Sequence, residues 1–213
     1  MQIVNGCRGI IELQFDVIGK SAHAGRPDLG TNAIERAVSL VQEFKVLLAR
    51  YENEKLGSTT VNLSRLEGGK LQNDKIITQG NAVPDIARIL LDIRPSSELL
   101  TDTKIIKMLI NIGKKSNVKL SNIVTNISYP AYFLDMSTTS LSIDRYINRP
   151  YRKDLGSGGF YEAALFANAW KCPAISFGPG DARSSHTQQE RVNLQDLKEI
   201  KETFKKLLLT YRV

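Results

Sequence analysis

Two histidines are the residues of this sequence whose type most directly allows metal binding or proton transfer. They are His23 and His186, and the 213 residues contain no other histidine. Imidazole is a common metal ligand and proton carrier. Two such groups cannot build a histidine-rich metal centre or a multi-histidine proton relay. A zinc site would therefore have to draw on carboxylates or on another chain.

Both histidines lie in short segments that are rich in glycine, proline and polar residues, and a third segment of this kind lies between them. The first segment is Gly-Lys-Ser-Ala-His-Ala-Gly-Arg-Pro at 19–27, followed by Gly-Thr-Asn-Ala at 30–33. The second is Gly-Asn-Ala-Val-Pro-Asp at 80–85, followed by Asp-Ile-Arg at 92–94. The third is Phe-Gly-Pro-Gly at 177–180, followed by Ser-His-Thr at 185–187 and Glu190. The elements around these segments determine what they can do.

The first 130 residues predict a two-layer fold. Apolar and polar side chains alternate in four predicted strands, and apolar residues recur at helical spacing in two predicted helices. The strands are expected at 8–19, 58–66, 86–94 and 118–129, and the helices at 31–51 (capped by Thr31 or Asn32) and 98–115. Gly68-Gly69 should break the second strand, and Pro95 should end the third. The order β-α-β-β-α-β predicts a ferredoxin-like α/β (α+β) sandwich, with both helices on one face of the sheet.

Residues 131–213 predict an incomplete second domain. A helix is expected at about 160–171, a strand at 173–177 and a final helix at 193–211, capped by Asn193; residues 137–146 are compatible with a short helix. A single strand needs partners for its backbone groups. We therefore expect these residues to complete a sheet whose other strands lie in a missing portion of the chain or in a partner.

Composition narrows the function classes. The net charge of +7 is dispersed, without the dense basic stripe and paired stacking aromatics expected of a nucleic-acid-binding protein. No apolar run has the length of a membrane span, and no signal peptide is visible. The two cysteines, Cys7 and Cys172, do not form a disulfide framework, so a cytoplasmic location is expected.

Taken together, the three segments resemble the zinc-dependent exopeptidase and deacylase family. This family includes acetylornithine deacetylase, succinyl-diaminopimelate desuccinylase, aminoacylase and carboxypeptidase-type enzymes. The resemblance implies that residues 1–130 form the dimerisation (lid) domain, and that residues 131–213 form the C-terminal portion of an α/β zinc-peptidase catalytic domain.

The resemblance also implies roles for three residues of the lid domain. His23 matches the histidine that crosses the dimer interface and stabilises the oxyanion in the other subunit. Asn81 and Arg94 match the pair that binds the free carboxylate of the substrate, for which an amide N–H and a planar guanidinium are suited. Each residue also has a plainer interpretation. His23 could be a loop histidine satisfied by its own backbone, and Asn81 a turn residue before Pro84. Arg94 could be a solvated arginine at a strand end.

Three residues of the C-terminal part match the family as well. His186 matches a zinc ligand, and Gly178 and Gly180 match glycines that let the backbone approach the substrate. The alternatives are that His186 is an ordinary loop histidine and that the two glycines only form a tight turn. Glu162 lies near an acidic motif of the family, but an acid at a helix N-terminus is also favoured by the helix dipole.

The sequence departs from the family in its metal ligands. The family's catalytic domain supplies a His-x-Asp pair and a Glu-Glu pair, and this sequence contains neither dipeptide pattern. We expect the N-terminal catalytic part to be absent and most ligands of the two zinc ions of a complete site to lie elsewhere. Two hypotheses remain. The chain is part of an amidohydrolase acting on an N-acyl amino acid or small peptide, completed by a separate N-terminal half, or it is an inert dimerisation module that forms a homodimer through the lid domain.

Overall fold

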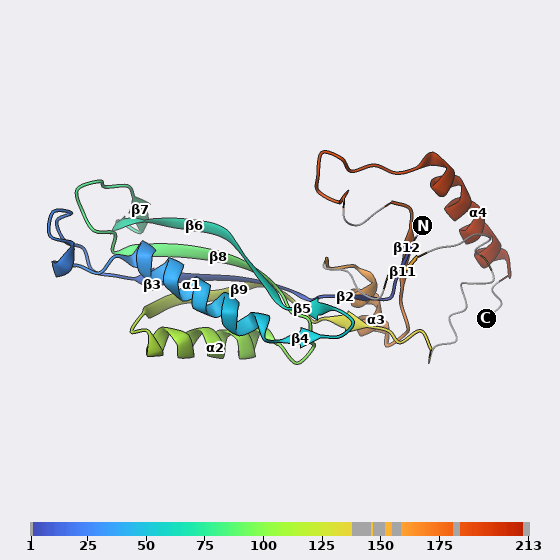
Figure 1. The fold of residues 1–213 in the computed structure, drawn as a ribbon, viewed down its shortest axis with the longest axis horizontal. Helices are drawn as coiled ribbons and strands as arrows, with labels where there is room; N and C mark the ends of the chain where they lie inside the picture. Colours follow the sequence, from blue (N-terminus) through green and yellow to red (C-terminus); the bar gives the residue numbers. More distant parts are fainter. Residues whose placement is uncertain (1, 138–145, 147–151, 155–158, 181–183, 211–213) are drawn as a thin grey trace. The chain divides into compact units, whose positions relative to one another are not determined.

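The computed structural model describes residues 2–137, 146, 152–154, 159–180 and 184–210 (Figure 1). The chain divides into two compact units. One comprises Arg8–Ala131, and the other combines Met1–Cys7 with Tyr132–Val213. The sequence places the first seven residues with the lid domain, whereas in the structure they belong to the second unit, because their strands pair there.

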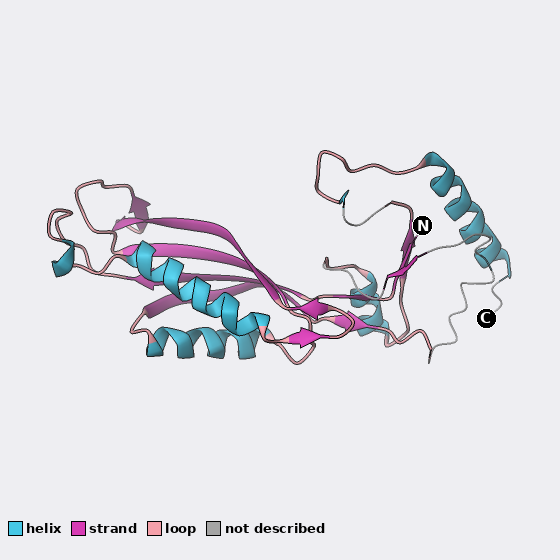
Figure 2. Ribbon diagram, in the orientation of Figure 1, coloured by secondary structure: helices cyan, strands magenta, loops and turns pink. Residues whose placement is uncertain are grey.

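The unit Arg8–Ala131 is a five-stranded antiparallel sheet with two helices, and it confirms the predicted α/β sandwich (Figure 2). The strand order is β7-β6-β8-β3-β9. Its strands are β3 (Ile10–Ile18), β6 (Thr60–Gln72), β7 (Lys75–Ile77), β8 (Ile86–Arg94) and β9 (Lys119–Tyr129), and its helices are α1 (Ala33–Ala49) and α2 (Asp102–Lys115). A small hairpin, β4 (Glu52–Asn53) and β5 (Gly57–Ser58), and a 3₁₀ turn, Pro27–Leu29, complete it.

The core of this unit lies between the sheet and its helices. Alternate residues of β3 and β8 point to this side, as a half-buried antiparallel strand requires. They pack on one stripe of each helix. The buried residues include Ile11, Leu13, Phe15 and Val17 of β3, Ala87, Ile89, Leu91 and Ile93 of β8, Leu40, Val41, Phe44 and Leu48 of α1, and Ile105 and Leu109 of α2. Asn32 caps α1, because its side chain accepts hydrogen bonds from the Ile34 and Glu35 N–H groups at 3.0 and 3.3 Å.

The prediction that Gly68-Gly69 breaks the second strand was wrong. β6 continues to Gln72, with Gly68 and Gly69 paired to Ala87 and Ile86 of β8. A Cβ at Gly68 would collide with the Ile34 side chain, and a Cβ at Gly69 would collide with the Ile77 carbonyl oxygen. The two glycines therefore allow close packing inside a continuous strand.

The second unit contains a three-stranded sheet, and part of this sheet comes from the first residues of the chain. β1 (Gln2–Val4) pairs in parallel with β11 (Arg152–Asp154) and antiparallel with β12 (Ser176–Gly178). Three further elements belong to this unit: β2 (Gly6–Cys7) with β10 (Tyr132–Phe133), α3 (Ala163–Trp170) and α4 (Leu194–Thr210). The short helix considered at 137–146 falls mainly outside the described residues.

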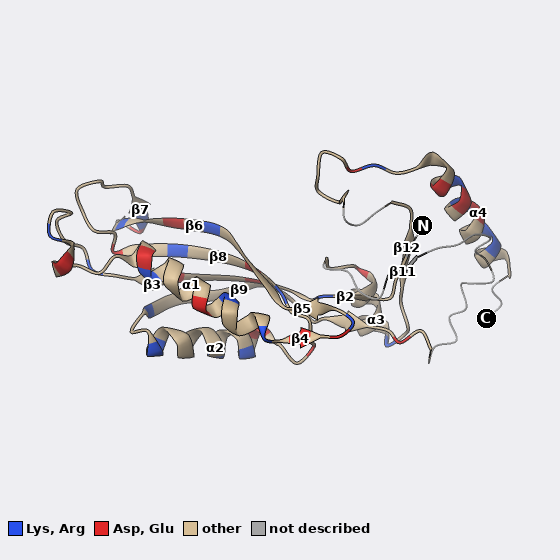
Figure 3. Ribbon diagram, viewed as in Figure 1, with Lys and Arg blue, Asp and Glu red and all other residues tan. Residues whose placement is uncertain are grey.

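A charged cluster is built around Asp16 of β3 and Arg88 of β8. Figure 3 shows that β6 and β8 carry charged residues along their length. Asp16 is buried and accepts two hydrogen bonds from Arg88, at 2.8 and 3.0 Å, and one from Asn122 at 2.9 Å. Burial alone would raise the pKa of Asp16. The hydrogen bonds from Arg88 and Asn122, with the charge of Arg88, outweigh burial and lower this pKa below its ordinary value of 3.8.

The Asp16 contacts predict a pH-dependent part of the stability. A lowered folded-state pKa contributes stability that is complete above 3.8 and is lost as the pH falls through the lowered value. The substitution Asp16→Asn should therefore lower the free energy of unfolding by about 1.5–3 kcal/mol at about pH 7, and by clearly less at about pH 3. Urea unfolding at both pH values measures this difference. Glu12→Gln is the control, since Glu12 accepts from the neutral Asn126 amide. An equal loss at both pH values would contradict the prediction.

Across the described residues, no helix combines the length and apolar character needed to cross a membrane.

Candidate functional site

His23 lies at one end of the five-stranded sheet, in the loop between β3 and α1. This loop is tied by its backbone to the segment that precedes β8. His23 pairs with Ala82 in an isolated antiparallel bridge, and the Ala24 N–H donates to the Asn81 carbonyl at 2.9 Å. The Val83 N–H donates to the Ala22 carbonyl at 2.8 Å. The structure therefore brings two of the predicted site residues, His23 and Asn81, to adjacent backbone segments.

The His23 side chain is exposed, and one of its ring nitrogens is engaged. The Gly25 N–H donates to Nδ1 at 3.0 Å. An Nδ1 that accepts a hydrogen bond carries no proton, so a neutral His23 bears its proton on Nε2. His23 thus presents an N–H donor on the far side of the ring from Gly25.

Arg94 lies at the opposite end of the same unit. Asn81 lies in the segment that leads into β8, and Arg94 is the last residue of that nine-residue strand. At about 3.3 Å per residue, β8 alone separates its two ends by roughly 26 Å. The Arg94 guanidinium holds Asp92 through Nε and Nη2, at 2.6 and 2.8 Å. Within one copy of the chain, Asn81 and Arg94 therefore do not converge on one carboxylate.

A second arginine, Arg8, lies near the same end of the sheet as Arg94, and no sequence motif points to it. Arg8 donates from Nε to the Leu56 carbonyl at 2.9 Å and from Nη1 to Thr60 Oγ1 at 3.4 Å. Thr60 is the register partner of Arg94 across β6 and β8. Burial lowers the pKa of Arg8 from its ordinary value. The one feature of the sequence that could have pointed to Arg8 is its position directly before the alternating apolar and polar residues of β3.

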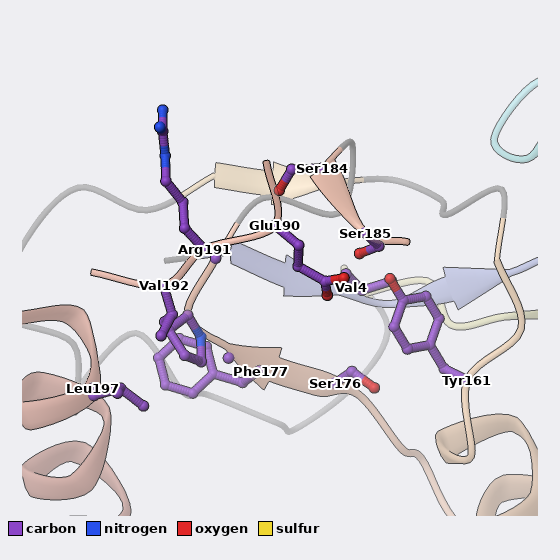
Figure 4. A pocket seen from close by; sticks show the side chains of 13 residues that line it. Val4, Tyr161, Ser176, Phe177, Ser184, Ser185, Glu190, Arg191, Val192 and Leu197 are labelled. Carbon is purple, nitrogen blue, oxygen red and sulfur yellow. The ribbon is translucent and has the colours of Figure 1, made fainter. Parts of the chain in front are cut away.

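A pocket of about 620 Å³ in the second unit is lined by two of the C-terminal candidates but not by His186 or Glu162. Gly178 and Gly180 line it, and Gly180 has a φ of 94° that an L-residue rarely adopts. Figure 4 shows the Tyr161 and Ser185 hydroxyls and the Glu190 carboxylate directed toward the same part of the pocket. Tyr161 was missed, although it is next to Glu162, the residue singled out from the sequence. Glu162 occupies the N-cap position of α3 without a side-chain capping bond.

His186 is exposed on the loop that follows this pocket. It has a φ of 62°, and its backbone N–H donates to Glu190 Oε2 at 2.9 Å. The loop is thereby closed by a carboxylate four residues further on. His186 and His23 belong to different units of the chain.

The donor set of the described residues does not fit a metal centre. No group of three or more His, Cys, Asp or Glu side chains in the described part could hold a metal ion. His186 with Glu190 offers two donor side chains at most, whereas a stable zinc site takes three or four protein ligands. The described residues are therefore too few to hold a zinc ion by themselves.

Comparison with known proteins agrees with this architecture. The description "Peptidase dimerisation domain" belongs to the family model that matches residues 5–119. A probable carboxypeptidase of Paracoccidioides lutzii is 24% identical, over 98% of this chain and 46% of the relative. A succinyl-diaminopimelate desuccinylase of Vesicomyosocius okutanii is 23% identical, over 97% of this chain and 53% of the relative. The chain thus spans about half the length of the curated relatives it matches.

A solved structure shows the same fold. A tripeptidase of Staphylococcus aureus superposes with a TM-score of 0.71 at 20% identity, over 95% of this chain and 52% of that one. The family model covers more than half of the residues. This chain belongs to the M20 peptidase family, of which it carries the peptidase dimerisation domain.

Proposed function

We propose that this chain contributes the dimerisation domain and C-terminal part of a metal-dependent amidohydrolase. The reaction is hydrolysis of an amide bond in an N-acyl amino acid or small peptide that bears a free carboxylate. The observation that carries the proposal is the exposed His23 at the end of a dimerisation-domain sheet, with Nδ1 held by the backbone and Nε2 available as a donor. Two free cysteines, Cys7 and Cys172, agree with a cytoplasmic location.

In this proposal His23 acts on a substrate bound by the other subunit of the dimer. Its Nε2–H donates to the carbonyl oxygen of the scissile amide. The bond strengthens as this oxygen gains negative charge, so it stabilises the transition state more than the ground state. A neutral imidazole performs this role without a change in its own protonation.

The metal ions of this enzyme would polarise the carbonyl and lower the pKa of a bound water. By family resemblance they are two zinc ions per complete site. His186 would be one ligand, and the others come from polypeptide outside the described residues. Gly178, Gly180 and the pocket beside Tyr161 would accommodate the substrate backbone.

Carboxylate binding requires two copies of the chain in this proposal. Asn81 lies beside His23, and Arg94 lies at the other end of β8. A single carboxylate can therefore meet both side chains only if Asn81 comes from one copy and Arg94 from the other. Arg94 already has an ion pair with Asp92, which orients its guanidinium. Among the described residues this pair takes two of its five N–H donors, and three are left for a ligand.

This arrangement predicts complementation between two inactive variants. Asn81→Ala and Arg94→Ala should each lose most activity alone. In a mixed dimer one site combines the intact Asn81 with the intact Arg94, and the other site lacks both. With random pairing, half of the dimers are mixed and half of their sites are intact, so about a quarter of the activity should return. Mixing the purified variants after reversible unfolding measures this. No recovery, with mixed dimers demonstrated by mass spectrometry, would contradict the two-copy site.

The proposal as a whole is tested on the chain recovered from its own cells. Native mass spectrometry with zinc quantification should reveal a complex with further catalytic polypeptide and about two zinc ions per site. That complex should hydrolyse N-acyl amino acids or dipeptides. A metal-bearing complex that hydrolyses neither substrate class would overturn the proposed reaction.

A second candidate function is an inert dimerisation module. The observation that favours it is the lack of a three-residue metal-binding group among the described side chains. It predicts a metal-free homodimer in the same mass spectrum. A strictly monomeric chain at high micromolar concentration would exclude this candidate.

A further inference from the structure

Gly25 contacts the imidazole ring of His23 directly. Its N–H donates to Nδ1 at 3.0 Å, across only one intervening residue. A Cβ at position 25 would lie 3.2 Å from Nδ1 and 3.5 Å from Cε1 of the same ring. The absence of a side chain at this position thus allows the ring to lie against the backbone.

The surrounding backbone fixes this contact from both sides. The Arg26 N–H donates to the His23 carbonyl at 2.8 Å, which closes a tight turn over Ala24 and Gly25. The Ala24 N–H is bound to the Asn81 carbonyl at 2.9 Å. Because both the turn and its neighbouring segment are hydrogen-bonded, the Gly25 N–H is directed at the ring before any substrate arrives.

We infer that Gly25 is a positioning residue that holds His23 as the Nε2–H tautomer with a fixed ring orientation. A histidine free in a loop exchanges between two neutral tautomers and several ring rotamers. The tautomer with its proton on Nδ1 cannot accept the Gly25 N–H, so the hydrogen bond selects the other tautomer. The catalytic consequence rests on the proposed role of His23 as an oxyanion donor, whereas the tautomer itself does not.

Spectroscopy on the full chain tests the inference without a substrate. With ¹⁵N labelling, a scalar coupling between the Gly25 nitrogen and His23 Nδ1 is expected across the hydrogen bond. Nδ1 should have the shift of an unprotonated nitrogen and Nε2 that of a protonated one. Because the chain contains only two histidines, the His23 signals are distinguished by comparison with a His186→Gln variant.

Two changes at position 25 sharpen the test. Replacing Gly25 by glycolic acid exchanges its N–H for an ester oxygen, which cannot donate to Nδ1, and should shift the His23 Nδ1 and Nε2 signals toward a mixture of both tautomers. Gly25→Ala keeps the N–H but presses a methyl group on the ring, and it should weaken the coupling. The matched controls are the same two changes at Gly80, where a Cβ would meet no atom within 4 Å. Both Gly80 variants should leave the His23 signals unchanged.

The catalytic consequence has a separate readout. In the active complex, glycolic acid at position 25 should lower kcat about three- to tenfold and leave KM unchanged, the range expected for one ordinary hydrogen bond. An absent coupling in the wild-type chain, or His23 Nδ1 and Nε2 shifts that the glycolic acid change leaves as in the wild type, would overturn the inference. An intact coupling in a complex without hydrolytic activity would instead overturn the proposed function.

Discussion

His23→Ala should lower kcat of the active complex by about 10²–10³-fold, the loss observed when one oxyanion donor is removed from a preorganised site. KM should change little, because the Nε2–H bond gains most of its strength as charge develops on the carbonyl oxygen. The fold should be unaffected, since His23 is exposed and its backbone bonds do not depend on the side chain. Steady-state kinetics on an N-acyl amino acid or dipeptide substrate gives both constants.

Lys20→Ala is the matched control for this variant. Lys20 is an exposed residue of the same loop, and its backbone is paired with Thr31. Its substitution should leave kcat within a factor of about two, as expected for a surface change of less than 0.5 kcal/mol. A His23→Ala complex that retains full kcat would remove His23 from the mechanism, whatever the chain's oligomeric state.

The part of the fold that sequence predicts best is the part set by local pattern. Alternating residues gave β8 its observed limits, Ile86–Arg94, and helical spacing located α1 and α2. At Gly68 and Gly69, where β6 continues, a Cβ would meet Ile34 of α1 and Ile77 of the neighbouring strand β7. Glycine pairs usually mark turns, and only the packed structure reveals that these two create room for neighbours.

In the second unit, local sequence pattern predicts even less of the fold. β1 is three residues long, and it pairs with β11 and β12, about 150 and 175 residues further along the chain. No periodicity can be measured over three residues. The strand near residue 175 was expected to pair with strands in a missing portion of the chain or in a partner, whereas β12 pairs with β1 at the start of the same chain.

For the candidate site, sequence motifs named residues but not their arrangement. The separation of Asn81 from Arg94 was available in principle, because a predicted nine-residue strand lay between them. The Gly25 hydrogen bond to His23 was not, since it depends on a side-chain rotamer and on the turn closed by Arg26. Arrangement decides the chemistry here, because it assigns Asn81 and His23 to one end of the sheet and Arg94 to the other.

The other large effect concerns stability. Phe15→Ala should lower the free energy of unfolding of the sheet unit by about 3–5 kcal/mol, the usual cost of removing a buried phenylalanine side chain. Phe15 lies at the centre of β3 with none of its surface exposed, and it is part of the cluster that joins both helices to the sheet. Since a domain of this size is stable by only about 5–15 kcal/mol, this single change should bring it close to the unfolding threshold.

The measurement must separate the two units, because a chain of two units need not unfold in one step. Trp170, the only tryptophan, belongs to α3 in the second unit. Far-ultraviolet circular dichroism follows both units, whereas tryptophan fluorescence follows the second. Phe15→Ala should move the circular dichroism transition to lower urea and leave the fluorescence transition in place. Val124→Ala on the edge strand β9, where Val124 is 48% exposed, should change the free energy of unfolding from either transition by no more than about 0.5 kcal/mol.

A parallel shift of both signals in Phe15→Ala would mean that the lid sheet does not fold as an independent unit. His23 and Asn81 would then be positioned by the whole chain and not by the sheet alone.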